Sequence, residues 1–382
     1  MGSNDKGRSG ASLIAIKKYP KSLLWTSIFY ISIISCGYGT VVTPAFYSTT
    51  YFVNRFGVMD NNRMDIEARW KFALIVGAAG GQAIGAVLSG WPSEKWGRKK
   101  VMFACNSGII LLVGMQLLSN SLGALCATNI LLGCIWGATI TQSVTYASEI
   151  SPLELRAILT AFSNMAFVIG QLIANGLAAI FESRTDHWSY KGPLAFQWLF
   201  CMALLIGIPL APESPWYLVR TGKFEKAKES LRKLSWNALN DLDIVVENIL
   251  KTDLMERESQ KSSSYSACFK GINLRRTEIC VISYASQILC GAPLPYFAVY
   301  FLQVSGIDPA EAFLMGVGNM AVGLAAYSIT FVALCYFGRR SIFCSGLWFM
   351  TIILLTIGIL DCVPNQSQNK GYAWAEAGLL AV

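Results

Sequence analysis

Long apolar runs separated by short polar stretches make up most of this chain. A run of about 20 apolar residues is long enough to cross the hydrocarbon core of a bilayer as a helix. Runs without charges predict nine complete spans, and a tenth run begins at Tyr372. The nine spans cover residues 23–46, 72–90, 101–118, 122–147, 157–181, 194–210, 279–302, 312–337 and 341–360. The pattern predicts an all-α membrane protein.

Composition and charge support the membrane interpretation. Only 14% of the 382 residues are charged, whereas soluble domains average about 25%. The net charge of +8 comes from basic residues that gather at span ends, on one side if the spans alternate, which places that side in the cytoplasm. We therefore expect a lipid bilayer as partner and no nucleic acid. No cysteine or histidine spacing fits a metal site, no cofactor motif is present, and no nucleophile–base pair indicates an enzyme.

A polar stretch after the sixth span divides the chain. We expect a cytoplasmic tail at 1–22, a six-helix half at 23–211, a connecting segment at 212–278 and a partial second half at 279–382. Two amphipathic helices are predicted in the connecting segment. They cover residues 223–234 and 241–254, and the second has an apolar stripe of Ile244, Val245, Ile249 and Leu250.

Several motifs carry a resemblance to a known family. The stretch from Gly90 to Lys100 resembles the loop motif G-x-x-x-D-R-x-G-R-R of the major facilitator superfamily, and Gly338-Arg339-Arg340 echoes it. Pro212-Glu-Ser-Pro215 resembles the P-E-S-P signature of its sugar porters. The stretch from Tyr146 to Arg156 is similar to fungal α-glucoside (maltose-type) permeases. The resemblance implies two six-helix halves, so we expect this second half to be incomplete and the chain to be C-terminally truncated.

The same motifs predict ion pairs at the cytoplasmic gate. Arg98 and Lys99 are expected to hold carboxylates at helix ends, so that the pairs latch the two halves shut. The alternative is that these bases only set the topology. The predicted gate residues are Glu94, Arg98, Glu149, Arg156, Glu213, Arg339 and Arg340.

Amides within the spans are the natural ligands for sugar hydroxyls, and aromatic rings add an apolar face. By the resemblance, Gln171, Gln287 and Asn319 match sugar-contacting positions of the family. Gln142 and Trp374 are further candidates. The alternative is that each amide bonds across helices for packing.

The spans contain no acidic or basic residue, although such residues normally mark proton pathways. By the resemblance, Cys36, Gly39 and Asn129 stand where proton-coupled relatives have carboxylates. We therefore expect transport of an α-glucoside such as maltose by alternating access, without proton coupling, in the plasma membrane. A non-transporting sugar sensor and an inactive truncated transporter stay open as alternatives, and so do the choice of sugar and the oligomeric state.

Overall fold

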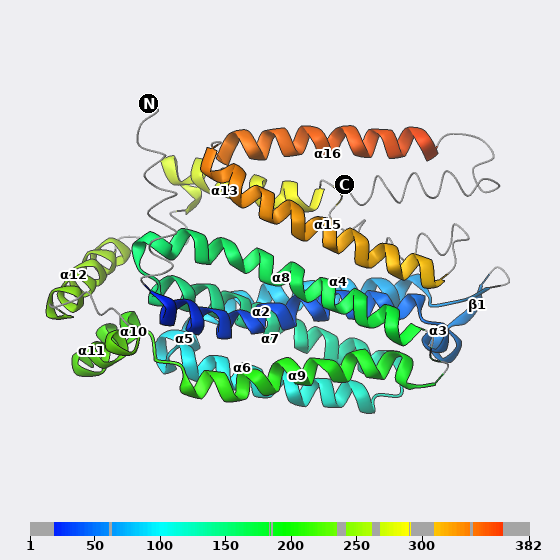
Figure 1. Cartoon of the computed structure of the whole chain (residues 1–382), viewed down its shortest axis with the longest axis horizontal. Helices are drawn as coiled ribbons and strands as arrows, with labels where there is room; N and C mark the ends of the chain where they lie inside the picture. Colours follow the sequence, from blue (N-terminus) through cyan, green and yellow to red (C-terminus); the bar gives the residue numbers. More distant parts are fainter. Residues whose placement is uncertain are drawn as a thin grey trace.

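The first half of the chain forms a bundle of six long helices. The computed structural model describes residues 19–60, 63–182, 184, 186–234, 242–261, 268–289, 291, 309–336 and 339–361. The six helices are α2 (Pro20–Ala45), α4 (Ala68–Leu88), α6 (Arg98–Leu118), α7 (Leu122–Ile150), α8 (Leu153–Glu182) and α9 (Trp188–Leu210). They run side by side along the long axis of the molecule (Figure 1).

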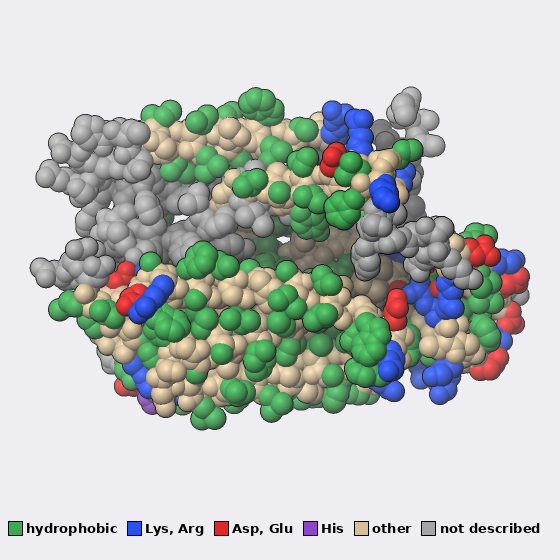
Figure 2. Space-filling view, turned by 180° about the vertical axis from the view of Figure 1, so that it is seen from behind, with side chains coloured by type: hydrophobic (Ala, Val, Ile, Leu, Met, Phe, Trp, Pro, Cys, Tyr) green, Lys and Arg blue, Asp and Glu red, His purple; other side chains and the backbone are tan. Residues whose placement is uncertain are grey.

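The polarity of this bundle is reversed relative to a soluble protein. Leu111, Leu118 and Ile206 are exposed on its outer surface, and apolar side chains cover its middle (Figure 2). Ser32 and Ser143 are buried inside, where their hydroxyl oxygens lie 2.7 Å apart. An apolar surface of this extent is unfavourable in contact with water. Lipid covers it, and the chain is an integral, multi-pass membrane protein.

Seven helices in the described part of the chain are long and apolar enough to span a membrane. They are Pro20–Ala45, Ala68–Leu88, Arg98–Leu118, Leu122–Ile150, Leu159–Phe181, Trp188–Leu210 and Arg340–Ile359. The predicted seventh span falls partly on α13 (Gly271–Leu289), and the eighth on α15 (Pro309–Tyr336), whose apolar part is the shorter Leu314–Thr330. The run that begins at Tyr372 lies outside the described residues.

Several helices begin before the predicted spans. α6 begins at Arg98 rather than at residue 101, and α9 begins at Trp188 rather than at residue 194. The extra turns carry Lys, Arg or other polar side chains, which a search for uncharged runs excludes. Long basic side chains at the end of a membrane helix can place their charges in the polar interface. A helix can therefore begin with such residues before its apolar part starts.

Small residues let α2 and α8 approach closely. A β carbon on Gly37 would overlap the backbone carbonyl of Phe167, and one on Gly170 would overlap the carbonyl of Ile34. Close backbone contact of this kind is a usual way to pack helices in lipid. On its other side α8 packs against α15, which in turn contacts α16 (Arg339–Asp361) (Figure 1). The second half therefore joins the first along α8.

The two ends of the bundle differ in character. One end carries the short helix α3 (Thr50–Phe56), which follows the 3-10 turn Phe46–Ser48, and the hairpin of β1 (Val58–Asp60) and β2 (Arg63–Asp65), in which Met59 pairs with Met64. The other end carries α5 (Gly90–Trp96), α10 (Pro215–Arg220), α11 (Phe224–Lys233) and α12 (Leu242–Lys261) (Figure 1). The predicted cytoplasmic side is this second end.

Helices α10 to α12 form a small apolar cluster of their own. Leu218, Leu231, Val246 and Ile249 are buried in it. The two predicted amphipathic helices correspond to α11 and α12, but α12 continues to Lys261. The predicted stripe is wrong at one position, because Ile244 is exposed and Val246 is buried in its place.

Candidate functional site

A tight turn between α5 and α6 organises the charged end of the bundle. Gly97 has φ of 92° and ψ of 161°, a backbone conformation that only glycine adopts readily. A β carbon there would lie 2.9 Å from Glu213 Oε2 and from a ring carbon of Tyr217. Gly97 therefore makes the tight turn between the two helices. The bare backbone lets the start of α6 lie directly against the segment that follows α9.

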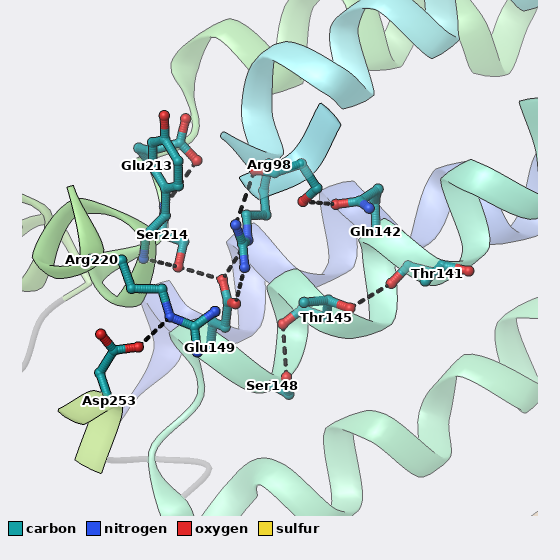
Figure 3. Close-up of polar contacts among 12 residues, drawn as sticks. Arg98, Thr141, Gln142, Thr145, Ser148, Glu149, Glu213, Ser214, Arg220 and Asp253 are labelled. Carbon is teal, nitrogen blue, oxygen red and sulfur yellow. Dashed lines mark hydrogen bonds and ion pairs between the residues drawn. The ribbon is translucent and has the colours of Figure 1, made fainter. Parts of the chain in front are cut away.

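The turn places Arg98 in a buried ion pair. Its Nη2 lies 2.8 Å from Glu149 Oε1 and its Nε lies 3.1 Å from Glu149 Oε2, a two-pronged pairing across α6 and α7. Arg98 Nη1 also donates to the carbonyl of Ser93. The two side chains are only 4% and 12% exposed. Figure 3 shows the guanidinium between Glu149 and the end of α5. Bidentate pairs of this kind fix geometry as well as charge.

The P-E-S-P stretch completes this network. Ser214 caps the start of α10 by accepting from the backbone N–H of Tyr217, and its hydroxyl donates to Glu149 Oε2 at 2.5 Å (Figure 3). Glu213 Oε1 accepts from the backbone N–H groups of Ser214 and Lys99, at 3.1 and 3.3 Å. Burial raises the pKa of Glu213 above its ordinary value, and these hydrogen bonds offset only part of that effect.

Lys99 does not form the side-chain pair that we expected. Its ammonium group donates to the carbonyls of Pro209 and Ala211, at 2.5 and 2.9 Å, at the end of α9. Carbonyls at a helix C-terminus lack partners within the helix and attract cations. Glu213 is held instead by the backbone N–H of Lys99. Lys99 therefore contacts a carboxylate through its backbone and not through its ammonium group.

The other predicted gate residues lie around this network. Glu94 is exposed on α5, and Arg340 is exposed on α16. Arg156 is partly buried, and its Nε makes no hydrogen bond among the described residues. It lines a cavity of about 440 Å³ together with Glu149 and Trp216. The side chain of Arg339 is outside the described residues. The described ion pairs therefore lie within the first half and the connecting segment.

A second charged group ties α12 to this end. Asp253 is only 3% exposed and accepts from Arg220 Nε at 2.7 Å and from Arg257 Nε at 2.8 Å. The outer carboxylate, Glu256, lies 3.2 Å from Arg220 Nη2. These residues line a cavity of about 270 Å³, which Glu94, Arg98, Tyr217 and Thr221 also line. These charges at the end of the bundle thus lie beside the apolar cluster of α10 to α12.

A different kind of cavity lies between α2, α4, α7 and α8. Its volume is about 240 Å³, and we call it the Trp136 cavity. It is lined by Gly39, Thr40, Thr43, Pro44, Leu74, Ile75, Ala78, Ala79, Gln82, Asn129, Trp136 and Phe167. None of these side chains carries a charge at neutral pH. Such a wall suits a neutral ligand.

The indole of Trp136 takes the place of a side chain at residue 39. A β carbon on Gly39 would overlap the six-membered ring of Trp136. Asn129 Nδ2 donates to the carbonyl of Leu74 at 2.9 Å, whereas its Oδ1 and Trp136 Nε1 are buried without a hydrogen-bond partner among the described residues. Gln82 Nε2 lies 3.7 Å from the sulfur of Cys36. The region therefore offers neutral donors and acceptors.

The predicted sugar residues lie in several places. Gln171 is 5% exposed on α8, one helical turn after the cavity-lining Phe167. Gln142 is bonded at both ends of its amide. Its Oε1 accepts from Ser93 Oγ at 2.6 Å (Figure 3), and its Nε2 donates to the carbonyl of Ser89 at 3.2 Å. It packs α7 against the α4–α5 junction.

The remaining candidates belong to the second half. Asn319 is partly buried on α15. Gln287 belongs to α13, but its side chain is outside the described residues, and so is the whole of Trp374.

Four residues of these sites were not among the residues predicted from the sequence: Gln82, Trp136, Ser214 and Asp253. Gln82 carries an amide within a predicted span, the signal that selected the other glutamines. Ser214 stands directly before a proline, a common start for a helix, which predicts a cap. Trp136 and Asp253 carry no signal in the sequence, because only the fold brings their partners to them.

Comparison with known families and proteins agrees with the motifs. The family described as "Sugar (and other) transporter" matches residues 25–382. The alpha-glucosides permease MPH3 of Saccharomyces cerevisiae is 32% identical over 378 residues, which cover 96% of this chain and 63% of the permease. The maltose permease MAL61 of Saccharomyces cerevisiae is 30% identical, with 96% and 61% covered. The chain thus spans less than two thirds of the length of these relatives.

Solved structures share the fold at low sequence identity. The xylose transporter XylE from E. coli, in a partially occluded inward open conformation, superposes with a TM-score of 0.73 at 19% identity. That match covers 94% of this chain and 83% of XylE. The proton:xylose symporter XylE bound to 6-bromo-6-deoxy-D-glucose gives 0.74 at 19% identity, with 94% and 80% covered. The architecture is that of the major facilitator superfamily.

Proposed function

We propose that this chain, which belongs to the sugar (and other) transporter family, moves a sugar across a membrane by alternating access. The names of its yeast relatives, an alpha-glucosides permease and a maltose permease, favour an α-glucoside such as maltose as the substrate. Permeases of this kind also favour the plasma membrane as its location. A membrane carrier needs no covalent chemistry, and the chain is not an enzyme.

The observation that carries this proposal is an uncharged cavity inside the bundle, in which the hydroxyls of Thr40 and Thr43 and the amides of Gln82 and Asn129 stand among apolar and aromatic side chains. Gln171 follows the cavity-lining Phe167 by four residues, which is about one turn of α8. A sugar is recognised by hydrogen bonds from neutral amides and by aromatic rings, so the residue types fit. We propose Gln171 as the first sugar ligand, and Gln287 and Asn319 as ligands from the second half.

Transport without proton coupling is part of the proposal. In the described spanning helices, acidic and basic side chains occur only in the turns at the helix ends. At the positions where proton-coupled relatives were expected to have carboxylates, this chain has Cys36, Gly39 and Asn129. Trp136 fills the space beside Gly39, so no carboxylate fits there without displacing the indole.

The charged end of the bundle is the proposed gate. The pair of Arg98 and Glu149, held by Ser214, fastens the first half to the connecting helices as one unit. Arg156 and Arg340 are then available to meet carboxylates of the other half when the gate closes. Opening would break those contacts and leave the buried pair intact.

Uptake of radiolabelled maltose by a transporter-deficient yeast tests the proposal. The wild-type chain is expected to take up maltose, and Gln171→Leu is expected to lower uptake at least tenfold at equal surface expression. Gln197→Leu is the matched control, because Gln197 is a buried glutamine of α9 outside the cavity. An expressed wild-type chain without uptake, or equal losses in both variants, would contradict transport through this site. The first outcome would favour the sensor or inactive alternatives.

A further inference from the structure

A cavity at the cytoplasmic end separates the bundle from the connecting helices, and we call it the Trp216 cavity. Its volume of about 440 Å³ falls within the range of about 300 to 1,000 Å³ that is typical of ligand sites. Its apolar lining residues are Pro152, Pro215, Trp216, Leu231, Val245 and Ile249. Apolar walls favour an apolar occupant over water. The cavity is therefore suited to receive aliphatic side chains.

One face of α12 forms a wall of this cavity. The lining residues of α12 recur at helical spacing and are Val245, Asn248, Ile249, Thr252 and Glu256. Asn248 and Thr252 are exposed. The turn before α8 and the start of α10 supply other parts of the lining. This face of α12 is thus turned toward the bundle without being covered by it.

The segment that precedes α2 begins at the same cavity. Tyr19 lines the cavity and packs against the cluster of Leu155 and Leu159 on α8. Residues 1–18, which precede it, lie outside the described residues, and their sequence contains one apolar run, Leu13-Ile14-Ala15-Ile16. The run ends three residues before Tyr19. At about 3.3 Å for each extended residue, it lies within about 10 to 20 Å of Tyr19, close enough to enter the cavity.

Charge also favours this segment as the occupant. Residues 1–18 include four basic residues and one acidic residue, and Lys17 and Lys18 directly follow the apolar run. The sequence of α12 holds five acidic and three basic residues. The charged residues that line the cavity are two carboxylates, Glu149 and Glu256, and one base, Arg156. A basic segment with an apolar centre matches this combination of apolar floor and acidic helix.

We propose that the apolar run of residues 13–16 docks in the Trp216 cavity and holds α12 against the cytoplasmic end of the bundle. Lys17 and Lys18 then lie beside the acidic helix. Because Tyr19 tethers the run next to the cavity, its effective concentration there is high, and a weak intrinsic affinity is sufficient. This interaction is separate from the sugar site and does not depend on which substrate is carried.

Hydrogen exchange of the purified full chain in lipid nanodiscs tests whether the run covers α12. Deletion of residues 2–16 removes the run, and the α12 amides are expected to exchange about tenfold faster, the effect of losing the burial of one aliphatic side chain. Exchange in α7 should not change. Deletion of residues 2–10 is the matched control, because it shortens the segment and keeps the run. Unchanged exchange of α12 in the first variant, or equal acceleration in both, would overturn the proposal.

Photochemical crosslinking tests where the run lies. With benzoylphenylalanine in place of Ile16, crosslinks are expected to residues of α10 or α12 that line the cavity. Asn248→Trp fills the cavity from an exposed position and should reduce these crosslinks at least fivefold. Leu254→Trp is the control, because Leu254 is 51% exposed on α12 and does not line the cavity. Thr252→Trp fills the cavity from the same face if Asn248→Trp does not fold.

Other arrangements give different crosslinks. Crosslinks from position 16 to the second half of the chain, or between two copies of the chain, would overturn the proposal and identify the true partner of the run. Crosslinks to α12 that persist in both cavity-filling variants would show that the run lies outside the cavity, which also overturns it. Loss of crosslinks in the cavity-filling variants alone, together with faster exchange of α12 after deletion of residues 2–16, is the result expected.

Discussion

Gly97 sets the position of several charged groups through its backbone alone. Its left-handed conformation turns the chain between α5 and α6, and its missing side chain admits Glu213 and Tyr217. Arg98, the next residue, thereby reaches Glu149, and the backbone N–H of Lys99 reaches Glu213. The charges of this motif depend on the turn that precedes them.

Replacing Gly97 with alanine should destabilise the protein by about 1 to 3 kcal/mol, because the backbone conformation is strained for any other residue and the new β carbon meets Glu213. Gly222→Ala is the matched control, since Gly222 also has a positive φ of 72° but no neighbouring atom within 4 Å of an added β carbon. Thermal unfolding in detergent measures both. Equal falls in Tm would show that the contact with Glu213 is unimportant.

The buried carboxyl of Glu213 should make stability depend on pH. Burial raises its pKa above the ordinary value of 4.5, so between the two pKa values the folded state holds a proton that the unfolded state has lost. Stability therefore falls as pH rises through that window. Glu213→Gln keeps an acceptor for the N–H groups of Ser214 and Lys99 but cannot ionise. The Tm of this variant relative to wild type should rise with pH from about 4.5 upward. A constant difference would contradict the assignment.

The sequence identifies candidate residues by their type and does not give the contacts that each of them makes in the fold. Gln171 and Gln142 carry the same amide within predicted spans, yet Gln142 bonds to Ser93 and Ser89 at the α4–α5 junction, and Gln171 follows the cavity-lining Phe167 by one turn of α8. Likewise Lys99 was expected to hold a carboxylate and bonds two carbonyls. Neighbours from other helices decide these roles, and one sequence does not contain them.

At the scale of elements, α12 depends on one buried carboxylate. Asp253 joins α12 to α10 through Arg220 and also pairs with Arg257 of its own helix. The apolar contacts of Val246 and Ile249 support only the first part of the helix. The second part is thus held mainly by charge.

Asp253→Ala should loosen α12 while the membrane helices stay folded. Losing the carboxylate leaves Arg220, whose side chain is only 28% exposed, with the outer Glu256 alone, at a cost of about 1 to 3 kcal/mol. Hydrogen exchange of the α12 amides should become faster, and exchange in α7 should not change. Glu256→Ala is the control, because Glu256 is half exposed and should have a smaller effect. Equal exchange in both variants would contradict the role of Asp253.

The spans were predictable because hydropathy reports directly on contact with lipid. The starts of α6 and α9 were not, since their first turns are helical although they carry basic or other polar side chains. The stripe on α12 was wrong at Ile244 because a partly apolar helix offers more than one candidate face. Which face packs depends on α10 and α11.

At the scale of the whole molecule, the first half is a bundle with polar groups inside and apolar groups outside. Its charges lie at the two ends (Figure 2), and its neutral cavity lies between α2, α4, α7 and α8. α15 lies along α8, the helix that carries Gln171. Movement of the second half against α8 would therefore alter access to the proposed sugar site, as alternating access requires.

Sugar transport without a proton carrier is the central claim, and simultaneous recording of maltose uptake and external pH tests it most directly. Transporter-deficient yeast that express the full chain should take up radiolabelled maltose while the pH of a weakly buffered medium stays constant. An uncoupler that collapses the proton gradient should leave the initial rate unchanged. Uptake accompanied by stoichiometric alkalinisation of the medium, or abolished by the uncoupler, would contradict the account.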